Sequence, residues 1–243
     1  MKRVISIILA VILIFSIGTI AVSAASSELI TLSAKNTVIT VSDENNIQVA
    51  YAAKVLKQYL NKILGADISV VSQAPQGMNV ITVSADSDKS ENGSYTISFQ
   101  KNAVLIQGAG TRGPIYGVYG FLEKYCDCRW YTKDMKLVPE KDAIVLPVGE
   151  KYDYTPYFEV TDTDFISPHD WEYSLAHGLS GSRYRSLPEE QGGNVDYISD
   201  SCHTFGNQFC SRDKYFEDHP EYFALRKGKR TSKQLCLTNP DVL

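Results

Sequence analysis

The fold of this 243-residue chain is decided by the stretch GTRGPIYGVYGFLEKYCDCRWY, from Gly110 to Tyr131. Pro114 stands where the first residue of a helix is expected, and apolar side chains follow it at three- and four-residue spacing. Gly117 and Gly120 lie inside this predicted helix, where each costs about 1 kcal/mol relative to alanine. We interpret them as positions of close approach, at which the helix lies against a sheet or another backbone.

The sequence on both sides of this helix predicts further regular elements. Apolar residues at three- and four-residue spacing predict an amphipathic helix over Ile47–Leu64, closed by Gly65. Ser94–Phe99 and Ala103–Gln107 read as a hairpin that turns at Lys101-Asn102. Other short strands are predicted at Thr37–Ser42, Ile68–Val71, Asn79–Val83 and Cys128–Tyr131. The pattern indicates an α+β layer of about 100 residues with its own core.

The glycines before the helix resemble a phosphate-binding loop. Gly108, Gly110 and Gly113 match GxGxxG after a strand and before a helix. A dinucleotide site also needs an acidic residue about twenty positions further on, and it follows a parallel strand rather than a hairpin. We therefore predict no cofactor here, and we interpret Arg112 as a hydrogen-bond donor to backbone carbonyls.

Composition and charge restrict the partners. The formal net charge is -4 and 21% of residues are charged, which is typical of a soluble globular protein. We predict no nucleic-acid partner, and we interpret the basic run Arg226–Arg230 as a solvated turn.

The amino terminus predicts export. Lys2-Arg3 precedes the apolar run Val4–Ile17, and small residues follow at Val22-x-Ala24. This order is typical of a secretory signal peptide over residues 1–25, so we expect a secreted or cell-surface protein. The alternative is an uncleaved anchor, since the apolar segment is about long enough to span a bilayer. Membrane contact is expected only through this segment.

The five cysteines are an odd number for an exported protein, so at least one stays free or pairs outside the chain. Cys126, Cys128, Cys202 with His203, and Cys210 could be read as metal ligands, but no paired CxxC spacing is present. We predict buried thiols or one disulfide, and no metal.

The second half of the chain predicts shorter helices and strands than the first half. We interpret Glu140–Tyr154 as a charged connector. The elements predicted after it are strands at Phe158–Asp162 and Asp196–Asp200, a short helix over Asp170–His177 closed by Gly178, a helical turn at Asp213–Asp218, and a helix that starts at Thr238–Asp241. Tyr222–Leu225 and Gln234–Leu237 flank the turn at Arg226–Arg230. Because the chain ends three residues into that last helix, we expect Leu243 to be a truncation point within a second domain.

These residues carry a resemblance to known families. Gly110–Glu123, Cys128-Arg-Trp-Tyr131 and Val138-Pro139 resemble the amino-terminal domain of bacterial α-glucuronidases, an α+β domain that also precedes the catalytic barrel of β-hexosaminidases. The downstream segments resemble uncharacterised exported bacterial proteins in which a glycosidase-like domain of unknown function (family 4838) follows that domain. Those segments are Cys202–Phe205, His219–Leu225, Gly228–Arg230 and Gln234–Pro240.

The resemblance covers about Ile39 to Leu243. It implies an α+β sandwich-like domain of the hexosaminidase domain-2 type over residues 28–150, followed over 151–243 by the incomplete beginning of a (β/α)8 barrel. It also implies an exported glycoside-hydrolase-like protein for polysaccharide or glycan breakdown, with carbohydrate as its partner and without a cofactor. The alternatives are a non-catalytic carbohydrate-binding or cell-surface protein and a structural module for cell-envelope assembly.

The catalytic acids are not identified by this sequence. Hydrolysis of a glycoside generally requires two carboxyl groups that flank the bond, and the second half of the chain offers no diagnostic pair. We expect these acids beyond Leu243, and we expect the chain alone to be inactive and poorly soluble because its barrel strands would have open edges.

Four residues are candidate substrate contacts. The resemblance places His203 facing the sugar, with a structural histidine bonded to the backbone as the alternative, and it places Asp162 and Asp164 at the end of the first barrel strand. Trp171 offers a ring for stacking on a pyranose. Related enzymes carry a sugar-binding arginine near the position of Thr161, and this departure leaves the substrate type open.

Overall fold

The computed structural model of this chain describes residues 28–88, 92–163, 165–181, 186–194 and 205–242. The chain divides into two compact units, Met1–Asn194 and Val195–Leu243. The predicted signal peptide, the predicted strand at Asp196–Asp200 and the candidate residues Asp164 and His203 lie outside the described residues. Among the residues that are described, no helix is long and apolar enough to cross a bilayer.

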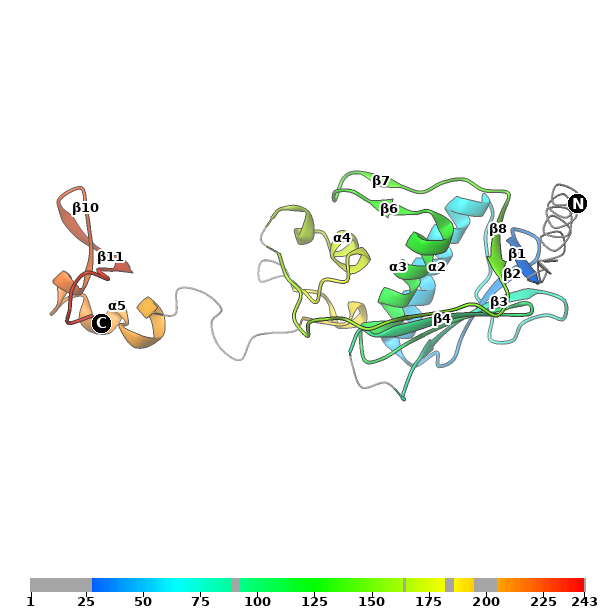
Figure 1. Cartoon of the computed structure of the whole chain (residues 1–243), viewed down its shortest axis with the longest axis horizontal. Helices are drawn as coiled ribbons and strands as arrows, with labels where there is room; N and C mark the ends of the chain where they lie inside the picture. The colour runs from blue at the N-terminus through cyan, green and yellow to red at the C-terminus, as the bar shows by residue number, and fades with distance from the viewer. Residues whose placement is uncertain (1–27, 89–91, 164, 182–185, 195–204, 243) are drawn as a thin grey trace, which may run out of the picture. The chain divides into compact units, whose positions relative to one another are not determined.

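A five-stranded mixed sheet forms the base of the first unit (Figure 1). Its strands, in spatial order, are β2 (Thr37–Val41), β3 (Asn79–Ala85), β5 (Ala103–Gly108), β4 (Tyr95–Gln100) and β9 (Lys151–Tyr154). The first three strands are parallel, and β4 runs antiparallel to both of its neighbours. The predicted β4–β5 hairpin is confirmed, and Asn102 in its turn has a φ of 58°.

Two long helices, α2 (Ile47–Leu64) and α3 (Gly113–Cys126), cover one face of this sheet (Figure 1). The Asn46 side chain accepts hydrogen bonds from the first backbone N–H groups of α2, and Gly65 ends the helix with a φ of 64°. The predicted bounds of α2 are therefore confirmed. Pro114 begins α3, as predicted, because its missing N–H needs no partner at that position.

The glycines of α3 permit close approach, as the sequence predicts. A Cβ at Gly117 would lie 2.7 Å from Ile106 Cγ2, and one at Gly120 would collide with the Tyr95 hydroxyl. At Gly113 a Cβ would lie 2.5 Å from two backbone atoms, the carbonyl carbon of Gly108 and the carbonyl oxygen of Ser94. Any side chain at these positions would force α3 away from the sheet.

A second, two-stranded sheet closes the core. It pairs β1 (Leu29–Ser33) with β8 (Ala143–Pro147), and both strands alternate buried and more exposed side chains. Strands β8 and β9 arise from the segment Glu140–Tyr154, so its interpretation as a connector is wrong. The alternating pattern of β8 buries Ile144 and Leu146 and is the period-two signal of a half-buried strand.

Two of the predicted strands are wrong. Ile68–Val71 forms only an isolated bridge between Val70 and Ile39. Phe158–Asp162 is irregular because no strand of the described residues pairs with it, and the backbone contact there joins Thr161 to Ser180. The predicted short helix is confirmed as α4 (Trp171–Ala176), which Asp170 caps through its side chain.

The described residues within 155–194 pack against α2 and α3. They contain the short turns η1 (Ser167–His169) and η2 (Glu189–Gln191) on either side of α4. Arg112 is 3% exposed, and its Nη2 donates to the carbonyl oxygens of Ser180 and Gly193 at 3.2 and 2.5 Å. The Tyr116 hydroxyl donates to the Leu179 carbonyl at 2.7 Å. The interpretation of Arg112 as a donor to carbonyls is therefore confirmed.

Short elements make up the second unit. In chain order they are η3 (Phe205–Phe209), α5 (Arg212–Tyr215), η4 (Pro220–Tyr222) and an antiparallel hairpin of β10 (Phe223–Arg226) and β11 (Lys229–Leu235). Asn239 Oδ1 accepts from Asp241 N at 3.0 Å, which is the bond that the predicted helix cap makes, and residues 240–242 form a turn. The described residues after Tyr154 contain no parallel strands, and the start of a barrel is not confirmed.

Candidate functional site

The first unit contains a cleft where α3, strands β6 (Arg129–Trp130) and β9, and the end of α4 meet. Its volume is about 440 Å³. We call it the aromatic cleft. It is lined by Tyr95, Tyr116, Gly120, Glu123, Arg129, Trp130, Tyr131, Tyr154, Leu175, Ala176, His177 and Gly178.

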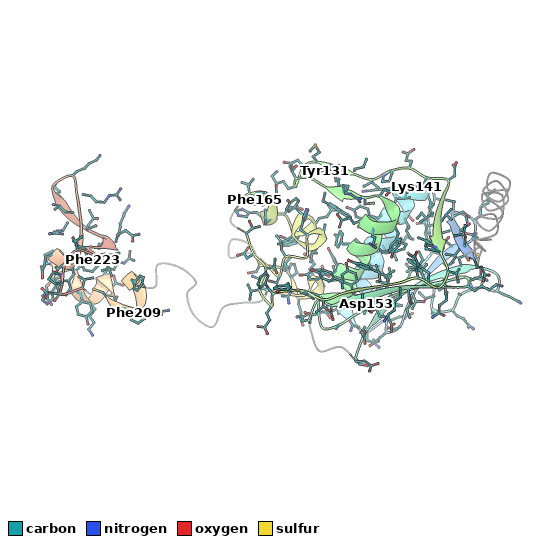
Figure 2. All side chains as sticks on the ribbon, viewed as in Figure 1. Tyr131, Lys141, Asp153, Phe165, Phe209 and Phe223 are labelled. Carbon is teal, nitrogen blue, oxygen red and sulfur yellow. The ribbon has the colours of Figure 1, made fainter. Side chains whose placement is uncertain are left out.

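Five aromatic side chains contribute to this lining. Tyr95 and Tyr154 stack with their ring centroids 4.9 Å apart and their planes at 26°. Tyr131 is 54% exposed and lies on the side of the unit that carries β6 (Figure 2). Gly120 makes room for Tyr95, since a side chain at that helix position would occupy the place of the tyrosine hydroxyl. One of the α3 glycines thus shapes the cleft as well as the core.

Three polar side chains accompany the rings. Arg129 donates through Nη1 to the carbonyl oxygens of Glu123 and Cys128, both at 2.6 Å. His177 places Nδ1 2.9 Å from the Tyr173 carbonyl and stacks on the Tyr173 ring at 4.0 Å. Because a carbonyl oxygen can only accept, Nδ1 is the donor in this contact. The third polar side chain is Glu123, so the cleft combines a carboxylate, a guanidinium and an imidazole.

A chain of hydrogen bonds ties two walls of the cleft together. Trp130 Nε1 donates to the Tyr59 hydroxyl at 2.8 Å, and that hydroxyl donates to Glu172 Oε1. The other carboxylate oxygen, Oε2, lies 2.6 Å from Lys136 Nζ. Lys136 belongs to β7 (Lys136–Leu137) and pairs directly opposite Trp130. Glu172, on α4, therefore holds both strands of the β6–β7 hairpin.

Electrostatics agree with this role for Glu172. Burial alone would raise the pKa of its carboxyl, but hydrogen bonds from Lys136 and Tyr59 outweigh that effect and lower the pKa. Burial, and then the bond to the carboxylate, raise the pKa of Tyr59 far above its ordinary value. At neutral pH the carboxylate is ionised and the phenol keeps its proton, which is the arrangement that the hydrogen bond requires.

A broader groove of about 640 Å³ follows α2 on the other side of Glu172. Its lining includes Tyr51, Tyr59, Lys62, Tyr119 and Glu172. Tyr59 and Tyr119 are buried, so they offer little ring surface to a ligand. Burial, with nearby carboxylates led by Glu190, raises the pKa of Tyr51 to about 12. Tyr95, Tyr116 and Trp130 of the aromatic cleft are buried as well, but this cleft also presents the 54% exposed ring of Tyr131 and the half-buried ring of Tyr154.

The candidate residues from the sequence fall elsewhere. Asp162 is exposed and accepts a hydrogen bond from Thr163 N at 2.7 Å. Trp171 begins α4 and packs half-buried against the core. Neither lines the aromatic cleft. The sequence reasoning did not identify Glu123, Arg129 or His177 as site residues, although Arg129 lies in the segment Cys128-Arg-Trp-Tyr131 that carries the family resemblance.

The cysteines give no disulfide among the described residues. Cys126 and Cys128 are buried free thiols, as predicted, and burial raises the pKa of Cys128 to about 11. Cys210 and Cys236 are free and half-buried, and Cys202 lies outside the described residues. Within the described ranges no three His, Cys, Asp or Glu side chains gather as metal ligands would.

Comparison with known proteins gives one family match. Residues 130–243 match a domain of unknown function, DUF4838. No curated protein matches the chain.

Several solved glycoside hydrolases are similar to part of the chain. A family GH115 4-O-methyl-α-glucuronidase with specificity for decorated arabinogalactans is 12% identical over 63% of this chain and 25% of its own, with a TM-score of 0.47. A mutant β-hexosaminidase of Streptomyces plicatus in complex with GlcNAc is 13% identical over 64% of this chain and 31% of its own, also with a TM-score of 0.47. A GH20 exo-β-N-acetylglucosaminidase of Vibrio harveyi is 12% identical over 65% of this chain and 23% of its own, with a TM-score of 0.44. The match spans less than a third of each of these solved chains.

Proposed function

We propose that this chain is part of an exported, glycoside-hydrolase-like, carbohydrate-active protein, and that the aromatic cleft binds a saccharide. The observation that carries the proposal is the lining of the cleft, which joins aromatic rings to a carboxylate, a guanidinium and an imidazole. Sugar rings present C–H faces that pack on aromatic side chains, while their hydroxyls need a few well-placed polar groups.

The cleft is proposed as a binding site and not as a hydrolytic centre. Glycoside hydrolysis generally uses two carboxyl groups roughly 5–10 Å apart. Glu123 is the one carboxylate among the described residues that line the cleft. Any hydrolysis by the whole protein would therefore use residues outside this lining. This observation also favours the second candidate function, a carbohydrate-binding protein without catalysis.

Two features of the sequence support the wider proposal. The basic start, apolar run and small residues at the amino terminus support export. The resemblance of Gly110–Glu123 and of the segments after Cys202 to carbohydrate-active families supports action on polysaccharide or glycan.

Calorimetric titration with soluble neutral oligosaccharides tests the cleft. Tyr131→Ala removes the most exposed ring of the cleft, and we expect it to weaken binding about tenfold. Tyr157→Ala is the matched control, because Tyr157 is 92% exposed and lies outside the cleft lining. We expect this control to bind as the unmodified chain does.

The proposal is overturned if no oligosaccharide binds or if both tyrosine variants bind equally well. Release of aryl groups from aryl-glycosides is measured in parallel, and we expect none. Release that disappears in Glu123→Gln would contradict the assignment of the cleft to binding alone.

A further inference from the structure

The second unit concentrates positive charge in one segment of an acidic protein. Between Tyr222 and Pro240 the sequence contains five basic residues and no acidic one, whereas the whole chain has a net charge of -4. The five are Arg226, Lys227, Lys229, Arg230 and Lys233. All of them lie in or beside the β10–β11 hairpin and are exposed.

The tip of the hairpin places these charges at a cost to its own stability. Arg226 lies directly opposite Lys229, and like charges in that relation destabilise a strand pair. Lys227 and Gly228 form the turn with φ values of 50° and 76°. Two-residue turns with positive φ favour Asn, Asp or Gly at the first position, so hairpin geometry does not explain a lysine there.

The acids of the second unit that the structure describes lie outside this segment, and one of them, Asp213, pairs with Arg212 at 3.3 Å. Arg226, Lys227, Lys229 and Lys233 form no ion pair with any residue that the structure describes, and Arg230 donates to the Phe223 carbonyl at 2.8 Å. A row of unpaired, exposed cations attracts a polyanion, which would remove the repulsion at the tip.

A pocket of about 240 Å³ adjoins the base of the hairpin. It is lined by Phe205, Gly206, Arg212, Phe223, Ser232, Lys233, Gln234, Leu235 and Leu237. Phe205 is 66% exposed and offers a ring, while Arg212 and Lys233 are cationic and Ser232 and Gln234 can bond to hydroxyl groups. Lys233 is one of the five basic residues of the hairpin segment and also lines the pocket.

We infer that this pocket and the β10–β11 hairpin together bind an acidic polysaccharide, a sugar chain that bears carboxylate groups. This inference rests on the proposed action on carbohydrate and names a substrate class for it. One acidic sugar occupies the pocket, with its carboxylate on Arg212 and Lys233 and its ring on Phe205, and the hairpin tip engages further carboxylates. The hydroxyl-bonding groups favour a sugar over a lipid surface. The net negative charge of the chain opposes the much denser charge of nucleic acid.

Affinity for polygalacturonate is measured with the full chain, at low and at raised salt. Fully methyl-esterified polygalacturonate is the matched neutral ligand, because it keeps the backbone and loses the charge. We expect the acidic polymer to bind more tightly, with an affinity that falls as salt rises.

Two variants test the hairpin. Lys227→Asn gives the turn a residue that its geometry prefers, so weaker binding in this variant does not reflect a lost fold. In the double variant Lys227→Asn with Lys229→Gln, we expect the affinity for the acidic polymer to fall about tenfold and to depend less steeply on salt. The control Lys35→Gln with Lys54→Gln changes net charge equally at exposed positions of the first unit.

Equal affinity for the acidic and esterified polymers would overturn the inference, and so would an equal loss in the control variant. Tighter binding to phosphatidylglycerol vesicles than to polygalacturonate would assign the hairpin to a membrane surface instead. The outcome is separable from that of the aromatic cleft. We expect the hairpin variants to bind neutral oligosaccharides as the unmodified chain does, through Tyr131. If the unmodified chain binds no neutral oligosaccharide, the proposal for the aromatic cleft fails, but a charge-dependent affinity for polygalacturonate would still support the role of the hairpin.

Discussion

The two units of this protein are stabilised and equipped in different ways. The first unit buries side chains from almost every strand and helix in one core, and its cleft lies on that core. Of the described residues in the second unit, Phe223 is the one hydrophobic side chain that is fully buried. The aromatic cleft therefore depends on precise packing, whereas the basic hairpin depends on charge and needs little buried structure.

We expect the largest difference between the two units when a glycine in each is replaced by alanine and the free energy of unfolding is compared. Gly113→Ala places a Cβ against backbone on two sides, so we expect it to lower the free energy of unfolding by about 3 kcal/mol or more. Gly206→Ala in the second unit meets nothing within 4 Å and should leave that free energy nearly unchanged. Urea denaturation of both variants measures the difference. Equal stability would contradict the close approach of α3 to the sheet.

Substitution of a buried arginine in the first unit should lower the free energy of unfolding more than substitution of an exposed arginine in the second. We expect this difference to be smaller than the one between the glycine variants. Arg112→Met leaves the buried carbonyl of Ser180 and the half-buried carbonyl of Gly193 without their donor, and we expect a loss of about 1–3 kcal/mol. Arg212→Met removes an exposed guanidinium from the second unit and should change stability by less than about 0.5 kcal/mol. Denaturation curves that shift equally for both variants would argue against Arg112 as the link between α3 and residues 155–194.

The smallest effect concerns Glu172. Because its pKa is lowered in the folded protein, its stabilising contribution is present above the pKa of an unfolded glutamate, about 4.3, and is lost as the pH falls through the folded value. Glu172→Gln should lack that acid-dependent loss. At neutral pH we expect it to cost less than about 1 kcal/mol, since the side chain is partly exposed.

Tryptophan fluorescence of chains that carry Trp171→Phe adds a readout of the wall of the cleft, because Trp130 is then the one tryptophan and it reaches Glu172 through Tyr59. We expect Glu172→Gln to alter the emission and to weaken saccharide binding. Asp127→Asn removes a comparable ion pair, with Lys141, outside the cleft and should do neither. Identical emission in both variants would show that Glu172 does not hold the β6–β7 hairpin.

Local signals in the sequence predicted the central elements of the first unit well. The spacing of apolar residues and Gly65 gave the bounds of α2, and Pro114 with the following glycines gave α3 and its close contact with the sheet. The same reasoning overlooked β8 and β9, although Ile144 and Leu146 alternate with more exposed neighbours. The charged and glycine-containing surroundings of these strands masked a period-two pattern only five residues long.

Local patterns in the sequence specify where the chain turns helical, where a helix must approach a sheet and where positive charge accumulates. These properties follow from neighbours three or four positions apart, or from composition. The lining of one cleft by Glu123, Arg129, Tyr154 and His177, and the connection of two of its walls by Glu172, follow instead from the three-dimensional packing. Those residues come from segments that local periodicity cannot relate, because their proximity results from the packing of α4 and the β6–β7 hairpin around a shared core.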